Sequence, residues 1–264
     1  MPTIVALVKH VPDTWSTKSL EADNTLDRVS VDNVIDEVNE FSVEQALRLR
    51  DDNPDQGFQV IALTMGPAQA DEALRKALAM GADDAVHVVD DALSGADALS
   101  TAWTLNAALN AVAQKFGDVQ IITMGNQASD SQTGLLAGLL AEYRQLPALT
   151  NLTSVALHGL SISGTREDAR GHWELEAALP AIVTVTDKSD KPRFPNFKGL
   201  MAAKKHEITV LSVADLGIEA IAPTTQVSQA EVLPPRTAGQ VISGVSAEQA
   251  AVHIADFLAD RNLI

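Results

Sequence analysis

Short apolar runs alternate with segments of helical periodicity along the first 150 residues of the chain. Buried strands are predicted where apolar residues are consecutive, at residues 4–8, 58–64, 84–89 and 119–124. Helices are predicted where apolar residues recur every three or four positions, at residues 36–50, 68–80, 97–116 and 134–143. Helices of this length connect parallel strands by right-handed crossovers. The pattern therefore predicts an α/β fold, a Rossmann-like parallel sheet with helices on both faces.

One polar loop, residues 126–133, joins an apolar strand to a helix rich in leucine and alanine. In open parallel sheets, ligands bind beyond the carboxyl ends of the strands, and residues 9–13 and 65–67 follow other strands at the same edge. The N–H groups and the dipole of a helix N-terminus at this place suit an anion. The alternative is that Asp130 or Ser131 merely caps the helix, but the three converging loops favour a binding site.

The pattern changes after residue 147. Residues 162–166 and 173–177 alternate polar and apolar side chains around a turn, which predicts an antiparallel hairpin, and residues 179–186 predict one further buried strand. Residues 187–205 then carry six basic side chains against two acidic ones, a local charge of +4. Prolines and a glycine disfavour regular structure in most of this segment. Charged runs of this kind are most often solvated loops.

The C-terminal segment has little to pack against within its own chain. Residues 218–244 contain proline, threonine and glutamine and show no period long enough to form a core. Ser246 and Gln249 then form a capping box that opens a last helix. Its apolar face carries Ala250, Ile254, Phe257 and Leu258. An extended arm that ends in an amphipathic helix favours a partner over folding back on the sheet.

Composition narrows the classes of function. The 264 residues carry a formal net charge of −16, which argues against binding to nucleic acid. Without cysteine, neither a disulfide nor a thiolate metal site is possible, and the six histidines lack metal-site spacing. A Walker sequence, a serine elbow and a strand-linked Gly-x-Gly-x-x-Gly are also absent from the sequence. We expect a soluble, cytoplasmic binding protein without catalytic residues and without a metal site.

Seven stretches, in order along nearly the whole chain, resemble the beta subunit of electron transfer flavoprotein. They are residues 8–13, 43–49, 77–83, 125–130 with 132–134, 179–184, 192–195 with 201–205, and 234–239. The resemblance implies the adenine-nucleotide-hydrolase-like fold and a heterodimer whose alpha subunit holds the redox-active FAD. Such heterodimers take electrons from acyl-CoA-type dehydrogenases in fatty acid oxidation and deliver them to a membrane quinone oxidoreductase. The beta subunit binds AMP or, in electron-bifurcating members, a second FAD.

The resemblance also implies the roles of particular residues and of two regions. Residues 1–187 would be the nucleotide-binding domain, and residues 188–264 a partner-docking loop and an arm around the alpha subunit. The nucleotide pocket would use Leu7, Lys9, Asp36, Val38, Asn39, Met65, Gly125, Asn126, Gln127, Asp130, Ser131, Gln132 and Thr133. The dehydrogenase would dock on Pro192, Arg193, Phe194, Phe197 and Met201, with Phe197 at the position of the family's apolar anchor. Within the pocket, Ser131, Gln132 and Thr133 would form the helix N-terminus that meets the phosphate.

Three departures from the family pattern bear on the ligand. The polar loop of residues 126–133 is shorter than in the mitochondrial type. Asp36-Glu37 replaces the usual Asn-Pro at the start of the first helix, and residues 168–171 replace the family's usual acidic-glycine turn in the hairpin. They leave the choice between AMP and FAD open. A stand-alone adenine-nucleotide-binding regulator is an alternative, but it would not need residues 234–239 or the helix after them. A nucleotide-hydrolysing enzyme is disfavoured because the sequence offers no plausible base or metal cluster.

Overall fold

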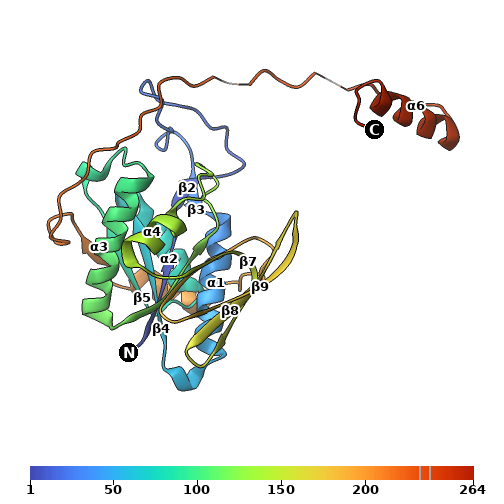
Figure 1. Cartoon of the computed structure of the whole chain (residues 1–264). Helices are drawn as coiled ribbons and strands as arrows, with labels where there is room; N and C mark the ends of the chain where they lie inside the picture. Colours follow the sequence, from blue (N-terminus) through green and yellow to red (C-terminus); the bar gives the residue numbers. More distant parts are fainter. Residues whose placement is uncertain (232, 238) are drawn as a thin grey trace. The chain divides into compact units, whose positions relative to one another are not determined.

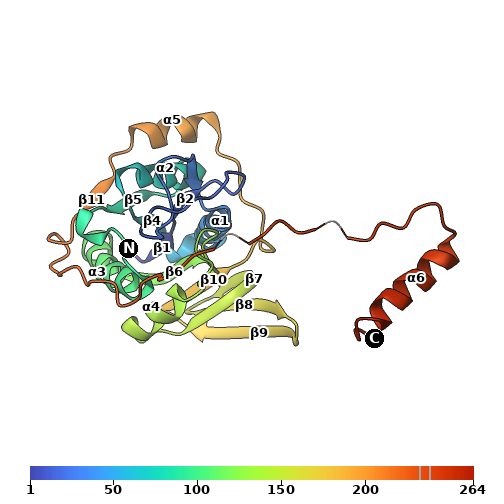
Figure 2. The same ribbon diagram turned by 90° about the horizontal axis from the view of Figure 1, so that it is seen from above.

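The computed structural model describes every residue except 232 and 238, and the chain divides into two compact units, Met1–Ser228 and Gln229–Ile264. Within the described residues of the first unit (Figure 1), nine strands form one sheet in the order β11-β5-β4-β1-β6-β10-β7-β8-β9, which the labels of Figure 2 let the reader follow. Seven of these strands are parallel: β1 (Thr3–Leu7), β4 (Gln59–Met65), β5 (Asp84–Val88), β6 (Val119–Gly125), β7 (Ala148–His158), β10 (Ala181–Val185) and β11 (Thr209–Leu211). The predicted α/β fold with a parallel sheet is confirmed.

Helices cover both faces of the sheet, as the continuous apolar strands predict. α1 (Glu37–Asp51) and α2 (Asp71–Met80) pack on one face, and α3 (Ala98–Phe116) and α4 (Leu136–Arg144) on the other (Figure 2). Along β1 the buried side chains alternate between the two cores, with Ile4 facing α1 and α2 and its neighbour Val5 facing α3 and α4. Three short 3₁₀ helices complete the connections, η1 (Pro54–Gln56), η2 (Ala68–Ala70) and η3 (Asp91–Leu93).

Side-chain caps fix the beginnings of two of these helices. Asp36 accepts the backbone N–H of Val38 at the start of α1, and Asp97 accepts that of Ser100 at the start of α3. Aspartate is among the preferred N-cap residues because its carboxylate satisfies an N–H group that has no partner within the helix. The helix starts predicted near residues 36 and 97 are therefore confirmed.

The predicted hairpin is part of a larger antiparallel extension of the sheet. β8 (Ser161–Asp168) pairs with β9 (Gly171–Ala178), as predicted, but β8 also pairs with β7, which the sequence pattern does not predict. β7 joins the extension to the sheet through its parallel pairing with β10. The alternation of polar and apolar residues is broken in β7 because its register shifts and because Asn151 has a φ of +57°.

Two further short strands are not predicted from the sequence. β2 (His10–Pro12) pairs antiparallel with β3 (Asn33–Ile35), which closes the base of the long loop between them. Each strand has only three residues, too few to show a period. The same reason explains why β11 at the sheet edge is not predicted.

The expectation that residues 187–205 are mostly irregular is wrong for their second half. α5 (Phe197–Lys205) is capped by Asn196, which accepts the N–H of Gly199 at 2.8 Å, and it packs on α2. A Cβ on Gly199 would lie 2.6 Å from the carbonyl oxygen of Ala79, so glycine permits this close approach. Because α5 and β11 both pack on the sheet domain, the first compact unit continues past residue 187 to Ser228.

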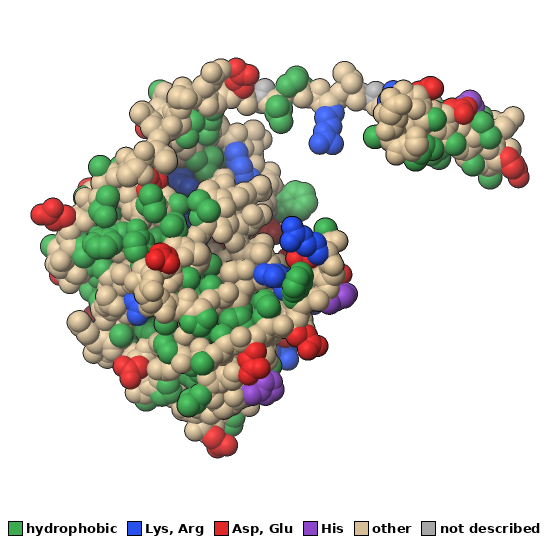
Figure 3. All heavy atoms as spheres, viewed as in Figure 1, with side chains coloured by type: hydrophobic (Ala, Val, Ile, Leu, Met, Phe, Trp, Pro, Cys, Tyr) green, Lys and Arg blue, Asp and Glu red, His purple; other side chains and the backbone are tan. Residues whose placement is uncertain are grey.

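The second unit contains one helix, α6 (Ala247–Ala259), among its described residues. The predicted capping box is confirmed: Ser246 and Gln249 exchange side-chain and backbone hydrogen bonds. Apolar side chains are visible on the surface of this helix in Figure 3. Ile254 and Phe257 are among its exposed apolar residues. The described residues of 218–244 form neither helix nor strand, and residue 238 of the motif 234–239 lies outside the described part. In that described part, no helix combines the length and the apolar character that a membrane span requires.

Candidate functional site

The polar loop after β6 passes very close to the beginning of α1. A Cβ on Gly125 would lie 2.4 Å from a methyl group of Val38 and 3.0 Å from the side-chain nitrogen of Asn39. Glycine allows this approach without a shift of these two side chains. The next residue, Asn126, donates its N–H to the carbonyl of Val185 at 2.9 Å and so stays in line with β10.

Asp36 ties the loop to the helix that it caps. Its second carboxylate oxygen accepts the N–H of Ser129 at 2.7 Å. Burial raises the pKa of Asp36, although N–H groups of Ser129 and Val38 stabilise the charged form. On the other side, Lys9 donates its N–H to Asn39 Oδ1 at 2.8 Å and accepts the N–H of Asp36 at 2.9 Å. The end of β1, the start of α1 and the loop after β6 are therefore one hydrogen-bonded unit.

The buried centre of this unit is an ion cluster formed by Lys9, Arg28 and Asp130, here called the Asp130 cluster. Asp130 Oδ1 lies 2.8 Å from Lys9 Nζ, and Oδ2 lies 2.5 Å from Arg28 Nη2. The carboxylate side chain is 0% exposed, whereas Lys9 and Arg28 are 40% and 34% exposed. Burial acts to raise the pKa of Asp130, but the two cations outweigh burial and hold the pKa below its ordinary value.

Arg28 is not among the site residues expected from the sequence. It lies in the loop between β2 and β3, where neither hydrophobic period nor motif marks it. The one signal available is charge: residues 13–32 hold five acidic side chains and only one other cation, Lys18. Its pairing with Asp130 joins two loops that are 102 residues apart in the chain.

Three of the expected residues are not placed as the sequence predicts. α4 begins at Leu136, so Ser131, Gln132 and Thr133 precede the helix, and all three are exposed. Gln132 and Gly134 have φ values of +49° and +62°, which turn the chain before the helix starts. The capping alternative is also wrong, because the N-cap position holds Leu135, whose side chain has no polar atom. Gln127 is exposed at the beginning of the loop.

The other expected residues line the same edge of the sheet. Leu7 ends β1 with its side chain in the core under α3, and Met65 ends the neighbouring strand β4. The structure therefore brings together the backbone of two strand ends, the first turn of α1 and the loop after β6. A separate polar hollow of about 430 Å³ begins at Asn126. It is further lined by Asn151, Thr153, Arg166, Glu167, Asp168, Thr186, Asp187 and Lys188.

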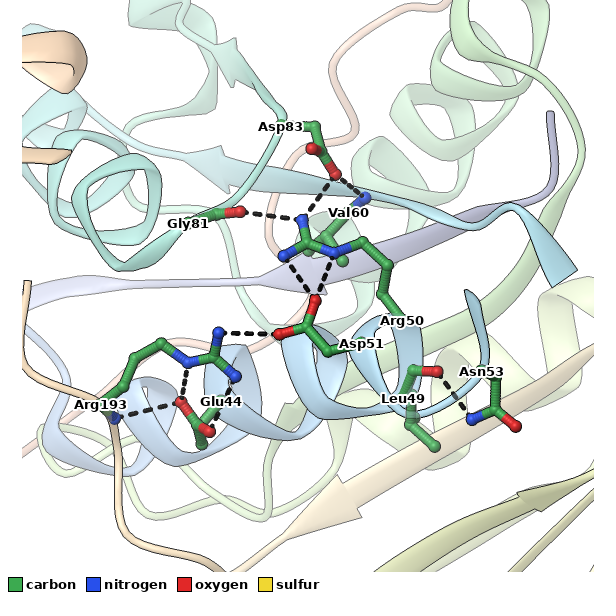
Figure 4. A network of polar contacts seen from close by, with 9 residues as sticks. All are labelled: Glu44, Leu49, Arg50, Asp51, Asn53, Val60, Gly81, Asp83 and Arg193. Carbon is green, nitrogen blue, oxygen red and sulfur yellow. Dashed lines mark hydrogen bonds and ion pairs between the residues drawn. The ribbon is translucent and has the colours of Figure 1, made fainter. Parts of the chain in front are cut away.

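The segment expected to dock a partner is held by a second ion cluster, formed by Glu44, Asp51 and Arg193 and here called the Arg193 cluster (Figure 4). Arg193 Nε and Nη2 bind the two oxygens of buried Glu44 at 2.7 and 3.1 Å, and Nη1 binds Asp51 at 2.9 Å. These hydrogen bonds raise the pKa of Arg193, Glu44 first. Asp51 also forms an ion pair with Arg50, and Arg50 forms another with Asp83 at 2.9 Å. Because Asp83 lies between α2 and β5, the network extends to these two elements.

The aromatic side chains after Arg193 face solvent. Phe194 is 95% exposed, and Phe197, the first residue of α5, is 80% exposed. Phe197 is thus not tucked into the surface of its own chain. Met201, one turn further along α5, is also exposed, and Pro192 precedes Arg193 at the anchored end. The ion pairs of Arg193 therefore fix one end of the segment, and the residues that follow present apolar side chains to solvent.

The fold and this edge define a class: Rossmann-like α/β proteins with a polar loop and a cationic cluster at the carboxyl ends of the strands. Residues 23–216 match the family of the electron transfer flavoprotein domain. The chain is 44% identical to electron transfer flavoprotein subunit beta of Mycobacterium leprae, over 92% of this chain and 93% of that protein. It is 31% identical to the caffeyl-CoA reductase-Etf complex subunit CarD of Acetobacterium woodii, over 99% of both chains.

The chain belongs to the electron transfer flavoprotein family and is of the beta-subunit type. Members of this family transfer electrons, and beta subunits pair with an alpha subunit.

Proposed function

We propose that this chain is the nucleotide-binding half of a cytoplasmic heterodimer that carries electrons from acyl-CoA-type dehydrogenases towards a membrane quinone oxidoreductase. The redox-active FAD belongs to the alpha partner, and this chain binds AMP. The observation that carries the proposal is the Asp130 cluster, where two cations meet one buried carboxylate at the carboxyl edge of the sheet. An anionic ligand with an adenine end suits such an edge.

The residues present fit a nucleotide. Lys9 and the polar loop of residues 126–133 supply the donors for a phosphate, with Ser131, Gln132 and Thr133 free to approach it from the exposed side. Val38 and Met65 supply the apolar surroundings of a base, Asn39 adds an amide, and Leu7 contributes its backbone at the end of β1. Gly125 leaves the space for the backbone to come close. AMP contributes no redox chemistry, whereas FAD supplies electron transfer wherever it is bound.

A second candidate is a beta subunit of the electron-bifurcating type, with FAD in place of AMP. The similarity to a subunit of a caffeyl-CoA reductase-Etf complex, over 99% of both chains, supports this second candidate. Asp36-Glu37, in place of the Asn-Pro of the family, bears on the same choice because it changes the ribose end of the pocket.

Residues 188–264 supply the contacts with other proteins in this proposal. The exposed Phe194, Phe197 and Met201 dock the dehydrogenase, while the arm with its apolar helix α6 holds the alpha subunit. A stand-alone nucleotide-binding regulator has no use for an arm whose helix presents Val252, Ile254 and Phe257 to solvent.

The test is to co-express the chain with its alpha subunit, purify the complex, and release and identify the nucleotides by mass spectrometry. One FAD and one AMP per heterodimer are expected, and the chain purified alone should be colourless. Two FAD per heterodimer would support the bifurcating type. One FAD with no second nucleotide would contradict the assignment of a nucleotide site to this chain.

A further inference from the structure

The loop of residues 13–32 holds Arg28 in a fixed position. Asp27 accepts the Ser30 hydroxyl and the N–H groups of Ser30 and Val29, the last two at 3.0 and 2.9 Å. The Ser30 hydroxyl first, and then the two N–H groups, lower the pKa of Asp27 to about 2. The side-chain amide of Asn33 donates to the carbonyl of Arg28 at 2.8 Å. The backbone is therefore tied on both sides of Arg28. The ion pair with Asp130 holds the side chain itself, so the arginine loses little side-chain entropy when it binds a further group.

In the Asp130 cluster two cations share one carboxylate. Within the described residues, Lys9 and Arg28 are both paired with buried Asp130, in a chain whose net charge is −16. The carboxylate of Asp36 lies close enough that Asp130 adds to the effect of burial in raising the pKa of Asp36. A lysine ammonium has three donors and an arginine guanidinium has five. Asp130 accepts from one nitrogen of each. Because both cations are more than a third exposed, their other donors can reach a ligand from the solvent side.

We infer that Arg28, acting together with Lys9, recognises the phosphate of the bound nucleotide and makes this site selective for phosphorylated adenosine over adenosine itself. The inference rests on the proposed function, since it assumes that the ligand is a nucleotide. It adds a residue that the resemblance does not supply. The planar guanidinium suits phosphate because it can donate two parallel hydrogen bonds to its oxygens. Asp130 orients both cations and keeps them at the edge of the pocket.

The experiment compares AMP with adenosine on the heterodimer after dialysis to remove its exchangeable nucleotide. Calorimetric titrations are made with wild type, Arg28→Gln, Arg28→Lys and the control Arg170→Gln, which changes an exposed arginine in the β8–β9 turn. Arg28→Gln should weaken AMP binding at least tenfold and adenosine binding less than twofold. Arg28→Lys should fall between wild type and Arg28→Gln, and Arg170→Gln should match wild type.

An equal loss of AMP and adenosine affinity would mean that Arg28 only holds the loop, and unchanged AMP affinity would mean that it has no role; either result overturns the inference. If Arg28→Gln does not fold, as judged by its thermal transition, Arg28→Lys is used instead. Its loss of AMP affinity is then compared with its loss of adenosine affinity. Wild type that binds neither AMP nor, in a parallel titration, FAD contradicts the proposed function itself. If the site binds nucleotide and the Arg28 variants bind it as tightly as wild type, only this inference is rejected and the proposed function is retained.

Discussion

The two ion clusters of this protein have opposite composition. In the Asp130 cluster one buried carboxylate meets two cations, and in the Arg193 cluster one cation meets two carboxylates. Both are attached to α1, the first at its N-terminal turn through Asn39 and the second along its later turns through Glu44 and Asp51. The same helix thus organises both regions.

The difference in composition separates a ligand site from a docking surface. The Asp130 cluster leaves cationic donors facing solvent, which suits a small anion. The Arg193 cluster uses its guanidinium on carboxylates of its own chain and thereby fixes the backbone that precedes Phe194 and Phe197. An anchored segment with exposed aromatic groups suits a protein partner that must bind and leave quickly.

Removal of the buried charge should have the largest effect. Asp130→Asn leaves Lys9 and Arg28 without their carboxylate, and we expect a loss of about 2–3 kcal/mol in the free energy of unfolding. This is less than the cost for a fully buried pair, because both cations are partly exposed. Urea denaturation of the first unit measures the loss. Asp55→Asn, in η1, is the matched control and should match wild type.

The same variant has a predicted pH dependence. The folded-state pKa of Asp130 lies below its ordinary value of 3.8, so its contribution is present above pH 3.8 and is lost as the pH falls through the folded-state pKa. The stability difference between wild type and Asp130→Asn should be constant at neutral pH and shrink below about pH 3.8. A difference that stayed constant into strong acid would show that the charge of Asp130 is not its source.

The Arg193 cluster should follow with a smaller effect on stability. Arg193→Gln leaves buried Glu44 without its cation, at a cost of about 1–3 kcal/mol in the free energy of unfolding. Electron transfer from the cognate dehydrogenase should also slow, because the docking segment is no longer fixed, while bound nucleotide is retained. Lys198→Gln, an exposed change in α5, controls for the loss of charge. Loss of nucleotide from Arg193→Gln would contradict the separation of the two regions.

Phe197→Ala tests the docking surface without disturbing its anchor. Reduction by the cognate dehydrogenase should slow at least tenfold, equivalent to about 1.4 kcal/mol. Nucleotide content and assembly with the alpha subunit should be unchanged, because Phe197 faces solvent. Leu160→Ala, at an exposed turn between β7 and β8, is the control. Wild-type transfer rates, or dissociation of the heterodimer, would contradict the docking role of this segment.

The smallest effect is expected at the exposed end of the ligand loop. Thr133→Val removes one hydroxyl that precedes α4, and we expect AMP affinity to fall by about 1 kcal/mol, roughly fivefold. The thermal midpoint should fall mainly when AMP is present, since the ligand stabilises only the folded form. Thr17→Val, an exposed change in the loop before Arg28, is the control. Unchanged affinity in a calorimetric titration would remove Thr133 from the site.

Features that depend on neighbours in the sequence were determined by the sequence itself. The apolar runs of β1, β4, β5 and β6 are buried on both faces, so each run is visible without its partners. Asp36, Asp97 and Ser246 mark helix starts because an N-cap acts within three residues of its own position. The edge that carries Lys9, Met65 and Gly125 also follows, because parallel strands place all their carboxyl ends together.

Features that depend on distant residues were decided only by the tertiary structure. β7 and β11 are strands because β10, β8 and β5 lie beside them, and their own residues show no clean period. α5 packs closely on α2 because Gly199 fits against the backbone of Ala79, at the end of α2. Arg28 reaches Asp130 only after β2 and β3 close the loop that carries it. The pairing of Arg28 with Asp130 spans 102 residues and depends on the folded backbone, so it cannot be predicted from local periodicity.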